Sequence, residues 1–143
     1  RPAGQLLPVR EVRGDVGVKA SFSRDRWEEA WTADLDVIRN LRSNGDDPLA
    51  PREIDVSFRG SRNALKRLAA ACSNFGFKVQ SFDNDEEGEP WLFLARVQTS
   101  DDEAMRELTE TYLQIEDSFD VECDGWGCMA SNHNGPISNE NPA

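Results

Sequence analysis

Two patterns of hydrophobic periodicity follow one another twice within residues 52–124, and this order limits the fold more than any other feature. Ile54, Val56 and Phe58 alternate with polar residues, as in a strand that buries one face. Apolar residues then recur every three or four positions as far as Gly76, which is typical of a helix that ends at a glycine. A strand, an acidic turn, another strand, a second helix and a last strand complete the series.

Capping residues define the expected ends of the helices. An earlier helix, with Trp27 and Trp31 on its apolar face, is predicted to begin after Ser23 and to stop at Asn44-Gly45. Ser61 is the expected N-cap of the helix after the first strand. Ser100 and Glu103 have the spacing of a capping box, which predicts the start of the last helix.

Two strands carry further information. Within residues 91–97, Trp91, Phe93, Ala95 and Val97 lie on one side and Leu92 and Leu94 on the other, which predicts a strand covered on both faces, or nearly so. In the final strand, Phe119, Val121 and Cys123 alternate with acidic residues that are expected to project from one face. These acidic residues are Asp120, Glu122 and Asp124.

The resulting order predicts an α+β domain of the ferredoxin-like split type, β-α-β-β-α-β, with an extra N-terminal helix. Two helices are expected to cover one face of a four-stranded antiparallel sheet. The domain is expected to span residues 23–130. Residues 1–22 form an N-terminal arm or a short extra strand in this interpretation, and residues 131–143 form a flexible tail.

The net charge of −11 is concentrated in one part of the chain. Residues 83–124 hold 15 Asp and Glu but only 2 Lys and Arg, whereas the preceding part is slightly basic. Such a field repels a phosphate backbone and attracts basic surfaces. The charge therefore indicates a basic protein partner, although a solvated face that maintains solubility would have the same composition.

The cysteines indicate the cellular compartment of the protein, and its hydropathy indicates whether it contacts a membrane. Cys72, Cys123 and Cys128 have no disulfide-framework spacing, and the chain has no apolar signal core, so reduced thiols in the cytoplasm are expected. No apolar run approaches the roughly 20 residues that span a bilayer, so no membrane contact is expected.

No catalytic, cofactor or metal site is expected. The single histidine, His133, lies in the expected flexible tail, which gives a Ser-His-Asp or Cys-His arrangement little support, and Cys123 and Cys128 have no second pair with which to bind zinc. The three acids of the last strand could serve acid–base chemistry or bind a cation, but a solvated face explains them better. The stretch 89–96 has aromatic residues without the glycines of an RNA-recognition strand, which disfavours direct RNA binding.

Three segments resemble one known family. The run Phe119-Asp120-Val121-Glu122-Cys123-Asp124-Gly125-Trp126-Gly127 is similar to the F-D-V-E-Y-D-G-W-G ending of regulators of ribonuclease E activity B, the RraB-like family. Residues 38–47, ending in Asn44-Gly45-Asp46-Asp47, resemble its helix-end loop. Residues 65–79, ending in Phe75-Gly76-Phe77-Lys78-Val79, resemble its helix followed by a G-Y-x-V strand.

The resemblance implies a non-enzymatic regulator that binds and inhibits ribonuclease E or a similar basic RNA-processing enzyme. Its partner-binding residues would lie in the last strand: Asp120, Glu122, Asp124, Gly125, Trp126 and Gly127. Trp126 is either an aromatic anchor for the partner or a core residue behind the turn. An adaptor or immunity-type protein of the same fold, with an unrelated partner, is the alternative, and an RNA-binding module is the third hypothesis. Nothing in the sequence indicates the oligomeric state.

Overall fold

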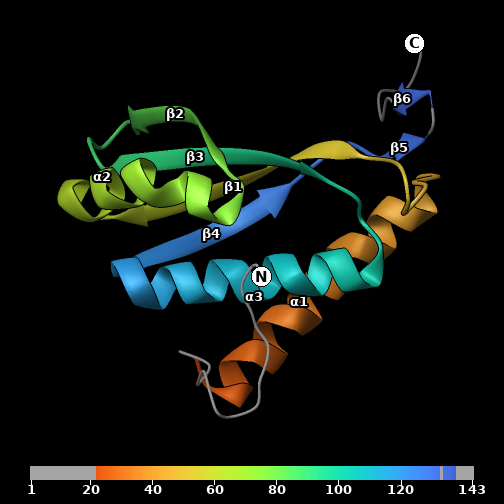
Figure 1. Ribbon diagram of the computed structural model, residues 1–143, viewed down its shortest axis with the longest axis horizontal. Helices are drawn as coiled ribbons and strands as arrows, with labels where there is room; N and C mark the ends of the chain where they lie inside the picture. The colour runs from red at the N-terminus through yellow and green to blue at the C-terminus, as the bar shows by residue number, and fades with distance from the viewer. Residues whose placement is uncertain (1–21, 133, 138–143) are drawn as a thin grey trace.

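The computed structural model describes residues 22–132 and 134–137, in which helices and strands follow in the predicted order (Figure 1). The expected N-terminal arm, apart from Phe22, lies outside the described residues. The elements are α1 (Arg24–Ser43), β1 (Arg52–Gly60), α2 (Arg62–Ala71), the 3-10 turn η1 (Cys72–Phe75), β2 (Lys78–Asn84), β3 (Pro90–Gln98), α3 (Asp102–Phe119), β4 (Val121–Gly127), β5 (Ser131–Asn132) and β6 (Gly135–Pro136).

Within the described residues, β1 to β4 form a four-stranded antiparallel sheet in the order β2-β3-β1-β4. β1 lies at its centre, where Val56 pairs with Leu94 of β3 on one side and with Trp126 of β4 on the other. This arrangement confirms the predicted α+β, ferredoxin-like class with an additional N-terminal helix.

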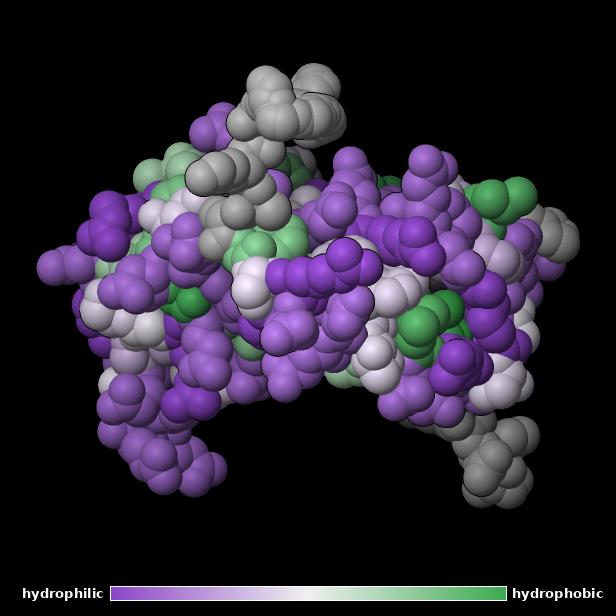
Figure 2. Space-filling view, turned by 90° about the horizontal axis from the view of Figure 1, so that it is seen from below, coloured by the Kyte–Doolittle hydropathy of each residue, from purple (hydrophilic) through white to green (hydrophobic). Residues whose placement is uncertain are grey.

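All three long helices lie on one side of the sheet, and the opposite face is not covered by any described element (Figure 1). α2 packs on β1 and β3, α3 packs on β4, and α1 crosses α3 obliquely. The core between these layers contains fully buried side chains from β1, α2, β3 and α3, among them Ile54, Val56, Phe58, Leu65, Leu68, Leu92, Leu94, Leu108 and Ile115. Seen from the side of α1 and α3, the surface is mostly hydrophilic, with apolar residues in separate small patches (Figure 2).

Two of the three predicted helix caps are confirmed. The Ser23 and Ser61 hydroxyls accept hydrogen bonds from the backbone N–H groups of Arg26 and Ala64, at 3.0 and 3.1 Å. The prediction of a capping box at Ser100 and Glu103 is wrong, because Asp101 is the N-cap of α3. The Ser100 hydroxyl donates instead to the buried Asp46 carboxylate.

β3 is less covered than the expected cover on both faces, or nearly so, because no second layer lies on its open face. Leu92 and Leu94 face the helices and are fully buried, whereas Val97 on the other face is 67% exposed. The rings of Trp91 and Phe93 stack on one another on this open face, with centroids 6.1 Å apart. Mutual stacking shields part of their apolar surface without a second layer, so apolar residues at both parities do not require one.

The last strand begins later than predicted. Phe119 is the final residue of α3, and Asp120 caps this helix with a left-handed backbone (φ 58°) instead of belonging to the strand. The strand itself has a bulge, because Ser57 pairs with Gly125 while Phe58 pairs with Cys123. Asp124 is the extra residue, so the three acids do not project from one regular strand face.

The segment after residue 130 differs from the expected tail at its start. Ser131–Asn132 pairs with Gly135–Pro136 in a short antiparallel ladder. Ser131 is buried, and its backbone N–H donates to the carboxylate of Asp46 at 2.7 Å. A buried carboxylate needs hydrogen-bond donors, and Ser131 supplies one of those of Asp46. The packed part of the chain therefore continues beyond residue 130.

The left-handed cap gives a prediction about stability. Asp120→Gly should leave the free energy of unfolding unchanged or raise it by up to about 1 kcal/mol, because glycine adopts this conformation without steric cost. Gln114→Gly, on the exposed face of α3, should lower it by about 0.5 to 1 kcal/mol. Urea denaturation followed by circular dichroism measures both. Equal losses for the two variants would contradict the capping role.

Candidate functional site

The predicted binding segment lies on an edge strand, and its residues divide between the two faces of the sheet. Glu122 pairs with Arg59 and is exposed on the open face. Gly125 and Gly127 also occupy open-face positions, opposite Ser57 and Asp55, while Trp126 is turned toward the helices. Asp120 and Asp124 are exposed at the helix cap and at the bulge. The structure therefore does not bring Trp126 together with the acids on one surface.

Trp126 is held by a buried carboxylate from α1. Its indole Nε1 donates to Asp34 at 2.9 Å, and the hydroxyls of Thr109 and Tyr112 donate to the same carboxylate at 2.6 and 2.8 Å. Burial and the neighbouring Asp34 raise the pKa of Tyr112, so that its hydroxyl remains a donor. Of the two roles considered for Trp126, this geometry supports the structural one, since its polar group is already satisfied inside the protein.

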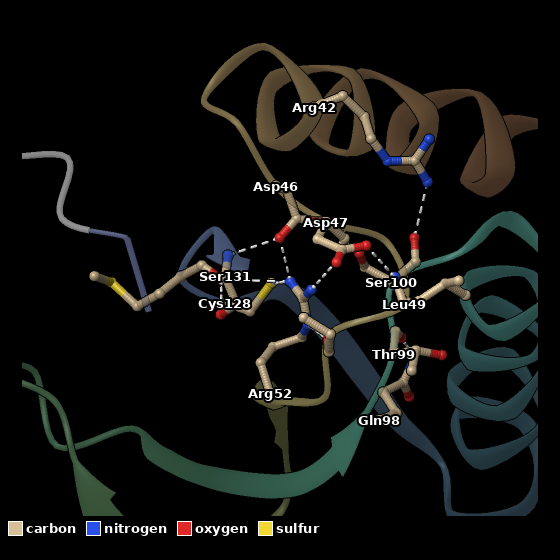
Figure 3. A network of polar contacts seen from close by, with 12 residues as sticks. Arg42, Asp46, Asp47, Leu49, Arg52, Gln98, Thr99, Ser100, Cys128 and Ser131 are labelled. Carbon is tan, nitrogen blue, oxygen red and sulfur yellow. Dashed lines mark hydrogen bonds and ion pairs between the residues drawn. The ribbon is translucent and has the colours of Figure 1, made fainter. Parts of the chain in front are cut away.

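A second buried carboxylate holds the chain immediately after β4 (Figure 3). Asp46 forms a 2.7 Å ion pair with Arg52, and both side chains are almost completely buried. Arg52 also donates to the backbone oxygens of Asp47, Ala50 and Met129. Because Asp46 further binds the backbone N–H of Ser131, this network ties the loop after α1 to the segment that follows Gly127.

The charge state of Asp46 results from opposing effects. Burial alone would raise its pKa, but hydrogen bonds from Ser100, Arg52 and Ser131, together with the charge of Arg52, outweigh burial and hold the pKa below its ordinary value. Asp46 therefore remains an anion at neutral pH, and the pair with Arg52 stays intact.

The outer edge of β4 is closed by a third polar contact. The backbone N–H of Cys123 donates to Glu116 of α3 at 2.8 Å, and Arg26 of α1 donates to the same carboxylate at 3.2 Å. A carboxylate over an edge N–H prevents another strand from pairing there. This part of β4 is therefore poorly suited to recognition by strand addition.

The thiols show little capacity for chemistry. Burial raises the pKa of Cys123 to about 12, and burial also raises the pKa of Cys72 and of Cys128. All three thiols are therefore neutral at physiological pH, and a neutral thiol is a weak nucleophile and a poor metal ligand. Within residues 22–132 and 134–137, no three His, Cys, Asp or Glu side chains form a group that could hold a metal ion. His133 lies outside the described residues.

The open face of the sheet carries charged and aromatic side chains side by side. The guanidinium of Arg59 lies over the Trp91 ring, 5.1 Å from its centroid, and the Trp91 indole donates to Asp85 at 3.0 Å. Lys78 of β2 forms an ion pair with Glu53 of β1 at 3.1 Å. These residues did not stand out in the sequence, because the register that joins them becomes visible only once the strands are paired.

Two shallow hollows lie on this face, and both involve β4. One, of about 340 Å³, is bordered by Arg59, Glu89, Pro90 and Glu122. The other, of about 380 Å³, lies beside Gly125 and Gly127. Both are open to solvent, as expected for a surface that contacts a protein and not for a site that encloses a small substrate. None of the helices among the described residues combines the length and apolar character of a membrane span.

The role of Trp126 can be tested against a matched change. Trp126→Phe removes a donor from the buried Asp34 and should lower the free energy of unfolding by about 1 to 3 kcal/mol. Trp91→Phe removes a bond of the same kind to the exposed Asp85 and should cost less than about 1 kcal/mol. Thermal and urea unfolding measure both variants. Equal costs would show that the contact with Asp34 is not structural.

The buried ion pair predicts a dependence on pH. Asp46→Asn leaves Arg52 buried without a counter-charge and should lower the free energy of unfolding by about 3 to 5 kcal/mol at neutral pH. Because the folded pKa of Asp46 is lowered, its contribution is fully present above the unfolded value of about 3.9 and is lost as pH falls through the folded pKa. The difference between wild type and variant should therefore shrink in acid. Asp36→Asn, at an exposed ion pair on α1, is the control and should change stability by less than about 0.5 kcal/mol at any pH.

Comparison with known proteins agrees with the resemblance found in the sequence. A search of curated proteins found no match to the chain. The family model described as Regulator of ribonuclease activity B, RraB, matches residues 31–128, which include α1 from Trp31 onward and the whole four-stranded sheet. Since this match extends over more than half of the sequence, the chain belongs to the RraB family of regulators of ribonuclease activity.

Proposed function

We propose that this protein binds ribonuclease E, or a related endoribonuclease of RNA decay, and restrains RNA cleavage without catalysing a reaction itself. Membership of a family of ribonuclease regulators is the observation that carries the proposal. The neutral thiols and the open, shallow hollows agree with a binding role. The partner is a protein with a basic surface in this account, and neither RNA nor a membrane is bound directly.

The distribution of acidic residues supports a basic partner. The turn between β2 and β3 contains Asp85, Glu86, Glu87 and Glu89, all of which are exposed. Further exposed acids lie on α3 and β4: Asp102, Glu103, Glu107, Glu110, Asp117, Asp120, Glu122 and Asp124. A negative potential spread over neighbouring elements accelerates encounter with a cationic protein and opposes approach of RNA.

In this proposal, the acids of β4 border the contact and Trp126 does not enter it. Glu122 is exposed on the open face and Asp124 is exposed at the bulge of the same edge strand, and both would meet cationic groups of the partner. Such peripheral charges mainly change the association rate and its dependence on salt. Gly125 and Gly127 contribute to the surface by their lack of side chains.

The proposal is tested by cleavage of a labelled RNA by purified ribonuclease E in the presence of increasing amounts of this protein. Cleavage should slow, and the effect should weaken as ionic strength rises from about 50 to about 300 mM, because salt screens exposed charges. Glu122→Lys and Asp124→Lys should each reduce the association rate roughly three- to tenfold. Asp36→Lys, on α1, carries the same charge change and should have a smaller effect.

Other outcomes would contradict the proposal. Unchanged cleavage and no complex at low salt would show that the ribonuclease is not the partner. This outcome would favour the alternative hypothesis, an adaptor or immunity-type protein with an unrelated partner. Retention of the labelled RNA by the protein alone would mean that any slower cleavage came from masking of the substrate. Equal inhibition by the wild type and the two lysine variants of β4 would exclude the acidic contact.

A further inference from the structure

The larger hollow on the open face lies beside Gly125 and Gly127, two positions of β4 that have no side chain. Its lining includes Asp55, Ser57, Gln80, Phe93, Gly125 and Gly127. On the open face, β4 has glycine at both positions opposite Ser57 and Asp55, so the row of side chains that begins with Glu122 is interrupted there. The hollow is the space that this row would otherwise fill.

The two glycines differ in what the backbone requires. Gly125 has φ +144°, a conformation that side chains rarely adopt. Gly127 lies outside the left-handed region, and a Cβ placed on it would meet nothing within 4 Å. Neither backbone strain nor packing among the described residues therefore calls for glycine at 127. Its effect is to leave the sheet accessible at this point.

An acid without a cation borders the hollow. Lys78 pairs with Glu53 and Arg59 lies over Trp91, but among residues 22–132 and 134–137 no Lys or Arg forms an ion pair with Asp55. Burial and the nearby charge of Glu53 raise the pKa of Asp55, so an incoming cation would relieve an unfavourable anion.

An aromatic ring lies beside this acid. Ser57 pairs with Phe93 and Asp55 pairs with Ala95, so Asp55 and Phe93 are diagonal neighbours on the same face. Diagonal neighbours in an antiparallel pair are about 7 to 8 Å apart, a distance that one long side chain can bridge. The stack with Trp91 fixes the Phe93 ring on this face.

We propose that this hollow receives an arginine side chain of the ribonuclease partner, with the guanidinium paired to Asp55 and lying against the ring of Phe93. The inference rests on the proposed function and assigns a docking point to it. Arginine fits better than lysine, because its planar fork pairs with a carboxylate through two hydrogen bonds and stacks on aromatic faces. The existing contact of Arg59 with Trp91 shows the same chemistry on the same face.

A graded series at position 127 tests the docking point. Gly127→Ala and Gly127→Val should fold with unchanged or higher stability, because valine favours strands and a Cβ at this position meets nothing within 4 Å. Affinity for ribonuclease E, measured by fluorescence anisotropy, should fall with side-chain size, by roughly tenfold or more for valine. Asp55→Asn should lower the affinity for ribonuclease E roughly tenfold or more. Asp83 is an exposed acid on β2, and Asp83→Asn should lower this affinity by less than about twofold.

A second measurement separates this inference from the proposed function. Blocked triarginine and trilysine peptides carry equal charge and can be titrated into the isotope-labelled protein. Triarginine should shift the amide resonances of Gln80, Phe93 and Gly127, and Gly127→Val should abolish these shifts. Equal shifts with trilysine, or none with either peptide, would overturn the arginine site.

The outcomes are distinguishable. Wild-type affinity for the ribonuclease in both Gly127→Val and Asp55→Asn would overturn the docking point while leaving the proposed function intact. Failure of the wild type to bind the ribonuclease would refute the proposed function, and the peptide titration would then decide alone whether the hollow binds arginine.

Discussion

The hydrogen bond between the Trp126 indole and the buried Asp34 decides which face each residue at the end of β4 occupies. Because Trp126 is held on the helix side, the alternation of the strand places Gly125 and Gly127 on the open face. The ion pair of Asp46 and Arg52 then holds the chain just beyond these glycines. A buried carboxylate at each side of this short segment makes its position rigid, and a rigid segment is what a recognition surface requires.

The structure gives separate roles to features that looked like one motif in the sequence. The acids of residues 83–124 are spread over a turn, a helix and an edge strand, where they create a field instead of a single contact. The specific element in our proposal is smaller and lies between them, at Asp55, Phe93 and Gly127. Long-range attraction and local fit are thus assigned to different residues, in agreement with the usual division between association rate and specificity.

Most of the fold could be predicted from the sequence, because strong periodicity and caps such as Ser23 and Ser61 are local signals. One error arose from a distant partner, because Ser100 has the spacing of a cap but binds Asp46. Another was local: residues 91–97 seemed to need two covering layers, although Trp91 and Phe93, two residues apart on the open face, shield part of each other by stacking. Asp34 left one trace in the sequence, as an acid on the apolar face of α1. The hollow left none, because it depends on the register of three strands.

The central claim is that the partner covers the open face of the sheet and not the side of the helices. Hydroxyl-radical footprinting of the protein, alone and with ribonuclease E, measures this directly through the oxidation of aromatic side chains. Oxidation of Trp91 and Phe93 should fall in the complex, while that of Trp27 and Trp31 on α1 should not change. Protection of Trp27 and Trp31 with unchanged oxidation of Trp91 and Phe93 would contradict the account.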